Sequence, residues 1–291
     1  MSELVGRVAP ERAVLRMAGA DARTVLQGVV TNDVERLAPE RAVYAALLTP
    51  QGKYLFDFFL LEDGQDVLID IAADRAEALA KRLKMYCLRR DARLAPEPGL
   101  GVALVWPGAA EAHPPSPSTT PGQTATVVAD PRAEDMGWRV YAADPAAALS
   151  AMEAAAGTAE GYAARRVALG VPETGIELVP EDSFILEAGF GRLNGVDFRK
   201  GCYVGQEVTA RMHHKSTLKK RLVPVTVDGE AEPGTPVVTA EGKPAGTLFT
   251  QSAGRGLAHL RLDRAEGPLQ AGEARVIYAP EGDASGTGGR A

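Results

Sequence analysis

The chain has 291 residues, of which 45% are hydrophobic and 24% charged, with a formal net charge of -6 at pH 7. This length predicts two or three compact units rather than one core. The negative charge argues against a nucleic-acid partner, and no stretch approaches the roughly 20 apolar residues that cross a bilayer. Two cysteines are too few for a disulfide framework. With no secretory signal recognised, we therefore expect a cytoplasmic protein.

The first hundred residues alternate strand and helix patterns, which predicts an α+β sheet with helices on one face. Asp21 stands where a helix N-cap belongs, and Gly28 could end that helix. Pro50 and Gly52 in the segment TPQGK predict a hairpin-like turn. The expected strands are 12–18, 41–48, 54–61 and 66–72, and the expected helices are 22–28 and 74–85.

The remaining chain predicts a second small α+β unit and then an all-β unit. The many prolines of 107–122 predict an exposed loop, and the apolar runs after Leu222, divided by Gly and Pro turns, predict a small barrel. The tail lacks apolar residues and is predicted to be disordered. The expected strands of the second unit are 100–106, 125–129 and 138–141, followed by helices near 145–156 and 160–169.

The segment from Arg199 to Arg221 is the densest group of reactive residue types. It holds seven Lys or Arg residues against one acid, Glu207, in a chain whose net charge is negative. Such a run predicts an anionic partner, although most charge runs are only solvated surface. Within it, Arg199 and Lys200 precede Cys202, and nearby cations favour a thiolate by lowering the pKa of a thiol. Cys202 is therefore a candidate functional thiol, with simple packing as the alternative. Cys87, at the end of an amphipathic helix, is expected to pack.

Metal and hydrolase chemistry find less support in the same segment. Cys202 with His213 and His214 offers suitable ligand types for zinc or iron, but a closed zinc site needs four ligands. A site shared with a partner protein stays possible, as does an ordinary hydrogen-bonding role for the histidines. The chain contains no Gly-x-Ser-x-Gly elbow, no P-loop and no GxGxxG motif in a βαβ unit.

The residues Lys200 to Glu207, KGCYVGQE, match the signature of the YgfZ family of iron–sulfur cluster assembly proteins. The following HHKSTLKKRLVPV resembles the mitochondrial branch of that family. The resemblance extends through VPE, NGVDF, MYCLRR, TPQGK and TNDV, and so covers nearly the whole chain.

This family is similar in fold to the aminomethyltransferase (T-protein) of glycine cleavage, which implies a three-domain folate-binding α+β fold with a C-terminal small β-barrel. The implied segments are 1–97 and 159–220 for the folate-binding domain, 98–158 for the second domain, 221–280 for the barrel and 281–291 for the tail. ILEAGFGRLNG resembles the transferase segment whose glutamate holds the pterin ring, which maps that role to Glu187. The catalytic aspartate of the transferase falls on Phe56, with Asp57 beside it, which argues against aminomethyl transfer.

The resemblance thus implies an accessory factor rather than a conventional enzyme. Tetrahydrofolate would lie beside a set of polar residues, and Cys202 would act as a thiolate or as one ligand of a transient cluster shared with an iron–sulfur carrier or client protein. Two other hypotheses stay open: a folate-dependent one-carbon transferase or demethylase, and an interaction module without folate. The expected folate-binding residues are Asn32, Asp57, Glu187, Lys200, Tyr203 and Gln206.

Overall fold

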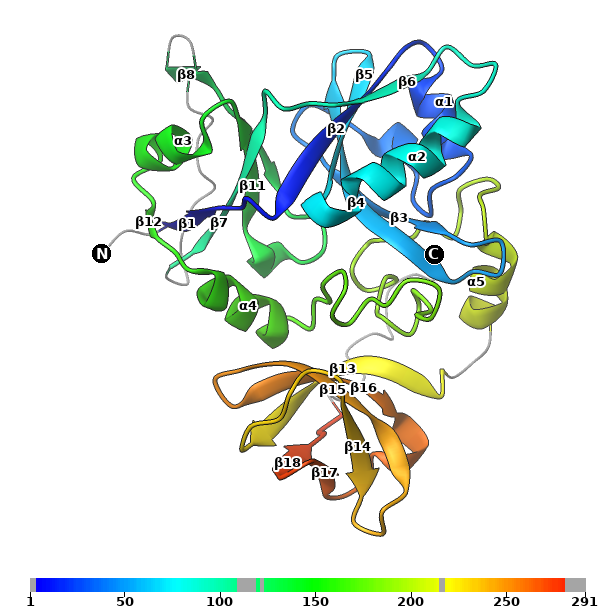
Figure 1. The fold of residues 1–291 in the computed structure, drawn as a ribbon, viewed down its shortest axis with the longest axis vertical. Coiled ribbons are helices and arrows are strands. Elements are labelled where there is room, and N and C mark those ends of the chain that lie inside the picture. Colours follow the sequence, from blue (N-terminus) through cyan, green and yellow to red (C-terminus); the bar gives the residue numbers. More distant parts are fainter. Residues whose placement is uncertain (1–3, 109–118, 121–122, 215–217, 281–291) are drawn as a thin grey trace, which may run out of the picture.

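A computed structural model describes residues 4–108, 119–120, 123–214 and 218–280 and shows two five-stranded sheets and a closed barrel (Figure 1). The first sheet has the strand order β3-β4-β5-β2-β6. Its strands are β2 (Arg12–Ala18), β3 (Val43–Leu48), β4 (Tyr54–Asp63), β5 (Asp66–Ala72) and β6 (Arg93–Pro96). The helices α1 (Ala22–Gln27) and α2 (Ala76–Tyr86) cover one face, and a 3-10 turn (Val34–Arg36) precedes β3. The predicted strands and the hairpin at TPQGK are confirmed.

The two ends of α1 differ in how well the sequence predicted them. Asp21 stands at the N-cap, but its carboxylate accepts the backbone N–H of Asp91 at 2.9 Å instead of capping α1. Gly28 follows the last helical residue, as predicted. The Asp21 carboxylate therefore joins α1 to the chain after α2.

The second sheet has the order β10-β11-β7-β1-β12. Its strands are β1 (Leu4–Val8), β7 (Gly101–Pro107), β10 (Thr126–Ala129), β11 (Trp138–Ala142) and β12 (Ala155–Ala156). The helix α3 (Pro145–Ala151) is shorter than predicted, because the chain then forms β12 against β1. The strand β1 belongs to this sheet although it precedes β2 of the first. The strands β8 (Thr119–Thr120) and β9 (Gln123–Thr124) form a separate two-stranded sheet. Much of the proline-rich loop and the tail after residue 280 lie outside the described residues.

A buried charge network joins the two sheets. The carboxylate of Asp70 on β5 is fully buried and accepts bonds from Arg12, Arg139 and Tyr141, each with a contact of 2.7 Å. The guanidinium of Arg139 also lies 3.9 Å from the centre of the Phe59 ring. Since each charge has a partner of opposite sign, burial does not leave the network uncompensated.

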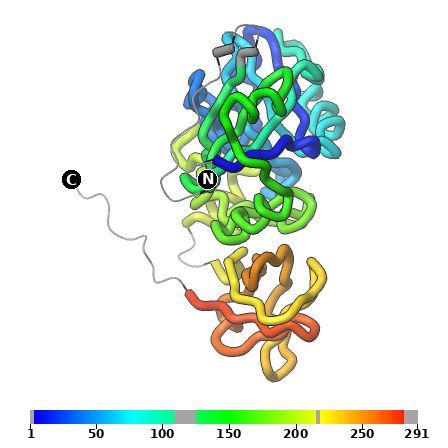
Figure 2. Tube along the Cα trace, turned by 90° about the vertical axis from the view of Figure 1, so that its left-hand side faces the viewer, coloured from blue at the N-terminus to red at the C-terminus, as the bar shows by residue number. Residues whose placement is uncertain are grey.

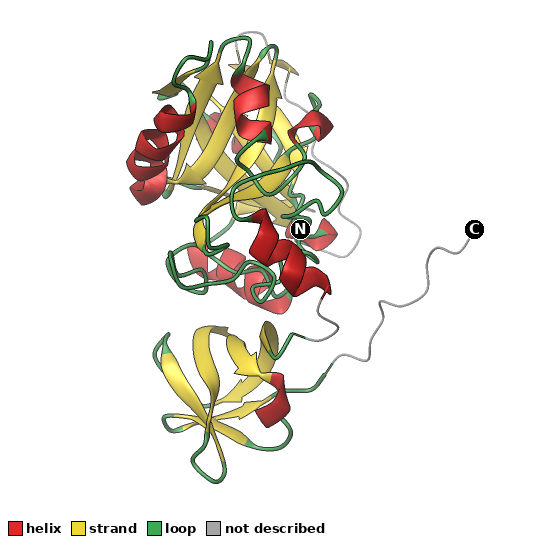
Figure 3. Ribbon diagram, turned by 90° about the vertical axis from the view of Figure 1, so that its right-hand side faces the viewer, coloured by secondary structure: helices red, strands yellow, loops and turns green. Residues whose placement is uncertain are grey.

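The C-terminal unit is a closed barrel, as predicted, and its strand order is β13-β16-β15-β14-β17-β18. Its strands are β13 (Lys220–Asp228), β14 (Thr235–Thr239), β15 (Pro244–Ser252), β16 (Arg255–Arg261), β17 (Leu269–Ala271) and β18 (Ala274–Ile277). The barrel lies below the two sheets, which makes the molecule elongated (Figure 2), and almost all of its regular structure is strand (Figure 3).

The barrel docks on α4 (Ala159–Ala168) and on the segment that follows it. Arg166, buried on α4, donates to Glu177 at 2.9 Å and to Thr250 of the barrel at 2.7 Å. Leu222 donates its N–H to the carbonyl of Glu187 at 2.7 Å. We call the part of the molecule that precedes the barrel the body. The contact between the body and the barrel forms one candidate binding region.

Candidate functional site

The KGCYVGQE segment forms a loop that leads into α5 (Gln206–His214). Lys200 fastens its start, because the amino group donates to the backbone carbonyls of Gln27, Val30 and Asn32 at 2.9, 2.6 and 2.9 Å. Burial lowers the pKa of this amine to about 8, although Asp33 and Asp197 favour the charged form. Lys200 thus anchors the loop beside the end of α1.

Two glycines fasten the other end of the loop. Gly205 and Gly52 both have positive φ, at +82° and +75°. A Cβ on Gly205 would lie 2.5 Å from the carbonyl oxygen of Thr49, and one on Gly52 would lie 2.7 Å from Val208. Only glycine allows the TPQGK turn and the start of α5 to approach this closely. The two sequence motifs therefore form one structural unit.

Gln206 and Tyr203 have structural contacts inside the loop. The side-chain oxygen of Gln206 accepts the backbone N–H of Tyr203 at 3.1 Å. The half-buried ring of Tyr203 packs against a core cluster formed by β3, β4 and residues 171–196, and it lies 5.3 Å from the amino group of Lys200. Burial also raises the pKa of the Tyr203 hydroxyl. These residues shape the loop, and neither lines the two cavities described below.

Cys202 is exposed at the outside of this anchored loop. A Cβ on the preceding Gly201 would meet nothing within 4 Å, so space is open on that side. Cys87 differs: it is half-buried, its thiol approaches the carbonyl of Leu83 at 3.4 Å, and burial raises its pKa. The packing predicted for Cys87 is thus present, whereas Cys202 is presented to solvent.

The histidines of α5 do not form a metal site with Cys202. His213 stacks on Phe198, with ring centres 3.7 Å apart and an angle of 13° between the planes. Within the described parts of the chain, no group of three or more His, Cys, Asp or Glu side chains could hold a metal ion. With the described residues alone, a metal or cluster at Cys202 would therefore need further ligands from another protein.

The side chain of Asn32 makes structural hydrogen bonds within the protein. Its side-chain amide donates to the carbonyls of Tyr44 and Asn194 at 2.8 and 2.6 Å, and its oxygen accepts the N–H of Asp33 at 2.8 Å. Both amide protons are therefore engaged.

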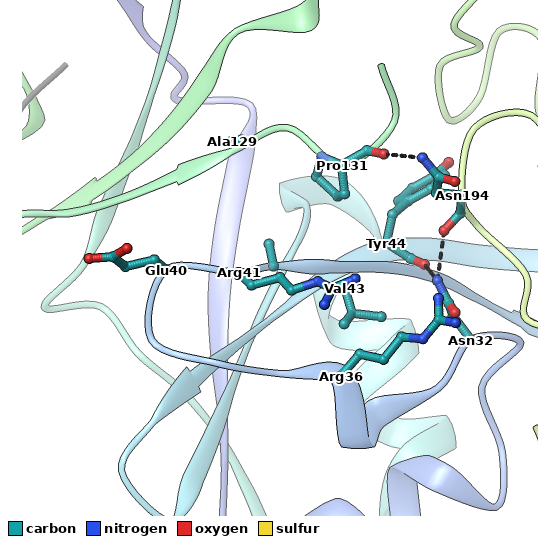
Figure 4. A pocket seen from close by; sticks show the side chains of 10 residues that line it. Asn32, Arg36, Glu40, Arg41, Val43, Tyr44, Ala129, Pro131 and Asn194 are labelled. Carbon is teal, nitrogen blue, oxygen red and sulfur yellow. Dashed lines mark hydrogen bonds between the residues drawn. The ribbon is translucent and has the colours of Figure 1, made fainter. Parts of the chain in front are cut away.

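A cavity of about 320 Å³ opens beside Asn32, between the start of β3 and the end of β10. Arg36 and Arg41 lie along it, and Tyr44 lies beside Pro131 and Asn194 (Figure 4). Of the six residues expected at folate, only Asn32 lines this cavity.

Asp57 is buried and held by three hydroxyls. It accepts bonds from Tyr54 at 2.6 Å, from Tyr44 at 3.0 Å and from Thr174. Burial and the Asp57 charge raise the pKa of both tyrosines well above the ordinary value, so they remain donors. Because successive side chains of a strand point to opposite faces of the sheet, Phe56 points away from Asp57 and packs in the core below α1 and α2.

Glu187 lines a different cavity, of about 420 Å³, between the body and the barrel. Its carboxylate lies 3.1 Å from the ring nitrogen of His259 on β16. The wall also carries Lys53, Lys219 and Lys220, together with the rings of Phe184 and Phe249. Sequence patterns missed His259 and Lys53, since neither lies in a motif. The six residues expected at one folate site are thus divided among two cavities, a buried cluster and the anchored loop.

Comparison with known proteins identifies the class of fold to which this structure belongs. The fold matches the crystal structure of the glycine cleavage system aminomethyltransferase T from Bartonella henselae with a TM-score of 0.74, covering 96% of this chain and 86% of that one. At 13% identity this likeness shows the fold alone, and it confirms the predicted aminomethyltransferase-like architecture. Residues 219–282 match the family model described as the CAF17 C-terminal beta-barrel domain.

Two curated relatives show the family. The mitochondrial iron-sulfur cluster assembly factors IBA57 of Mus musculus and Homo sapiens are each 35% identical to this chain, over 89% of it and 78% of their own length. The chain belongs to the IBA57 family, which confirms the predicted likeness to the mitochondrial branch. The expectation of a cytoplasmic protein is wrong, because these relatives are named mitochondrial. Among the described residues, no helix is long and apolar enough to cross a membrane.

Proposed function

We propose that this protein is an accessory factor in the assembly of iron–sulfur proteins and that Cys202 is its functional thiol. The observation that carries the proposal is an exposed cysteine on a loop whose backbone is anchored on both sides, by Lys200 and by Gly205. A structural cysteine would be packed, as Cys87 is. The relatives named as iron-sulfur cluster assembly factors support the same role.

In this proposal the cluster is cargo. Thiolate is a preferred ligand of iron–sulfur clusters, and the exposed thiol of Cys202 can approach a cluster held by a carrier protein. Because Cys202 offers a single ligand, the cluster would be shared during transfer and not stored. The anchored backbone limits the conformational entropy lost when the partner binds.

The test is replacement of Cys202 in cells depleted of their own protein of this family. We expect Cys202→Ser to leave [4Fe–4S] enzyme activity at the depleted level, while Cys87→Ser restores it. Circular dichroism of both purified variants checks that they fold. Full restoration by Cys202→Ser would refute the role of this thiol.

We also propose that the Glu187 cavity binds tetrahydrofolate or a derivative. A carboxylate can accept two N–H bonds from the aminopyrimidinone edge of a pterin, and the Glu187 carboxylate lines this cavity. Phe184 and Phe249 offer apolar surface, and Lys219 and Lys220 can pair with glutamate carboxylates of the folate tail. The cavity volume of about 420 Å³ lies in the range usual for small-molecule sites.

Calorimetry with tetrahydrofolate tests this site. We expect Glu187→Gln to weaken binding by roughly tenfold or more, because an amide cannot accept both N–H bonds. Glu181→Gln, a change at an exposed position outside the cavity wall, is the control. Equal binding by all three proteins, or no heat from the wild type, would contradict the proposal.

Asp57 provides the test that separates this function from folate-dependent aminomethyl transfer. Its carboxylate accepts three hydroxyl bonds and lines neither cavity, so we expect no turnover of an aminomethyl donor with tetrahydrofolate. Turnover by the wild type that is lost in Asp57→Asn would favour the transferase.

A further inference from the structure

The two most exposed large hydrophobic side chains in the described part of the molecule lie close together at the end of α2. Leu88 is 74% exposed and Met85 is 52% exposed, whereas the other exposed large hydrophobics lie between 39% and 42%. A single exposed apolar residue needs no explanation, but two adjacent ones of this exposure indicate a contact surface.

Basic side chains surround these two residues. Five cations between positions 81 and 93 are exposed, and none of them takes part in an ion pair within the described residues. They are Lys81, Lys84, Arg89, Arg90 and Arg93. The acids beside them bond to the backbone: Asp91 accepts from Ala20 at 3.4 Å, and Asp21 accepts from Asp91 at 2.9 Å. Positions 81–93 hold six Lys or Arg residues and one acid, Asp91, so this segment is positive in a protein of net charge -6.

The geometry of α2 holds this surface outward. Leu79 and Leu83 are fully buried in the core of the first sheet. Lys81, Lys84 and Met85 follow helical spacing along another face of α2, and Leu88 follows in the turn after Cys87. Past the helix, Arg89 has a φ of +63°, a left-handed conformation that is uncommon for a residue other than glycine. Leu88 therefore stands in a defined turn.

Helix-end electrostatics account for only part of this arrangement. Cations near a helix C-terminus offset its partial negative charge, and Lys84 can do so. That electrostatic effect does not explain why the apolar side chains of Met85 and Leu88 are exposed. An apolar centre surrounded by unpaired cations is instead the complement of an apolar pocket with an acidic rim.

We propose that this surface, which we call the Leu88 surface, docks a protein partner that presents acidic side chains around an apolar pocket. A lipid membrane is a poorer match, because interfacial helices bury a much larger apolar face than two side chains. RNA is also a poorer match, because single-stranded recognition uses exposed aromatic rings and Tyr86 is half-buried against the core. Figure 1 shows α2 on the outer side of the first sheet, while α5 lies at the tip of the β3–β4 hairpin.

The first test uses defined probes and the full chain. Fluorescence anisotropy measures binding of a labelled acidic peptide of alternating Glu and Leu, an all-Glu peptide, phosphatidylserine vesicles and poly(U) RNA. We expect the Glu/Leu peptide to bind most tightly. We expect its affinity to fall roughly tenfold in Leu88→Asp and in the Lys84→Glu/Arg89→Glu double variant. Arg275→Glu, an exposed charge reversal on the barrel, is the control and should bind normally.

The second test uses a photo-crosslinking amino acid at position 88 in cells, with position 240 on the barrel as control. The partner captured only from position 88 is then purified. The proposal predicts that its affinity is lowered by the Leu88 and Lys84/Arg89 variants but not by Arg275→Glu. Capture of lipid, RNA or a second copy of the chain, or binding that these variants leave unchanged, would overturn it.

This inference can fail independently of the proposed function. We expect Leu88→Asp to keep normal labelling of Cys202 and normal tetrahydrofolate binding, and Cys202→Ser to keep the partner of the Leu88 surface. If Cys202→Ser abolishes that binding, the partner docks on the anchored loop and the proposal is wrong.

Discussion

Charged side chains are paired inside the network around Asp70, whereas in the loop around Cys202 they have no close partner of opposite charge among the described residues. In the network, Arg12 and Arg139 contact a buried carboxylate at 2.7 Å, and the arrangement joins two sheets. In the loop, Lys200 bonds to three backbone carbonyls, and the 85% exposed side chain of Arg199 reaches only a distant contact of 3.9 Å with Asp197. Charges matched inside the protein stabilise the fold, whereas charges and thiols left outside are available to other molecules. Four predictions test this difference.

Asp70→Asn should give the largest loss of stability. Burial alone would raise the pKa of Asp70, but Arg12, Arg139 and Tyr141 lower it, so the carboxylate stays charged. Removing its charge leaves Arg139 buried without this partner, and we expect the free energy of unfolding to fall by about 3–5 kcal/mol. Urea denaturation measures this loss. In the wild type the contribution should disappear as the pH falls below about 4.

Asp66→Asn is the matched control for this change. Asp66 pairs with Arg16 at 3.0 Å, but both side chains are partly exposed and Arg16 keeps Asp63 and Glu97. We expect a loss of about 0–1 kcal/mol. Equal losses for Asp66→Asn and Asp70→Asn would contradict the distinction between the two kinds of charge.

Gly205→Ala should destabilise the anchored loop. The added Cβ would meet the Thr49 carbonyl at 2.5 Å, and φ is +82°, so we expect a loss of about 1–3 kcal/mol in urea denaturation. Gly201→Ala, where the Cβ meets nothing within 4 Å, should change stability by less than about 0.5 kcal/mol. If both variants unfold alike, the close approach of the two motifs is not what requires glycine.

The two cysteines should differ in reactivity. Cys202 is exposed, whereas Cys87 is half-buried and burial raises its pKa above the ordinary value of a thiol. We expect iodoacetamide to modify Cys202 roughly tenfold faster, as followed by mass spectrometry of the two peptides. Faster modification of Cys87 would mean that the loop shields Cys202.

The titration of Lys200 should give an effect that is seen only at alkaline pH. Its pKa is about 8 in the folded protein and near 10.4 in an unfolded chain, so the unfolded state binds more protons between these values. The free energy of unfolding should therefore rise as the pH goes from 8 to about 10.4. Denaturation curves across this range should lose that rise in Lys200→Met. NMR of methylated lysines should show one amine titrating near pH 8; if all titrate near 10, the amine is not desolvated.

Local patterns predicted most of the fold. Strand β2 and the hairpin at TPQGK follow from apolar runs and turn residues near in sequence. Local patterns did not predict the position of β1 in the second sheet, because its partners β7 and β12 are far along the chain. The predicted capping role of Asp21 was also wrong, because its carboxylate accepts the backbone N–H of Asp91 instead.

The site was predicted less completely than the fold. The motif identified Cys202 as a candidate, but its cations were expected to act on the thiol, whereas Lys200 turns to the end of α1. Asn32, Asp57 and Glu187 were expected together because the family resemblance implied one ligand. Sequence patterns could not show that the hydroxyl of Tyr44 reaches Asp57, or that His259 of the barrel faces Glu187.

The position of β1 has a consequence for how the protein is made. β1 leaves the ribosome before β7, its antiparallel partner, which follows about a hundred residues later. At about 5–20 residues per second, that interval is roughly 5–20 seconds. During this time the strand's backbone groups lack their ladder partners, while the strands of the first sheet can already pair. Vectorial synthesis therefore favours completion of the first sheet before the second.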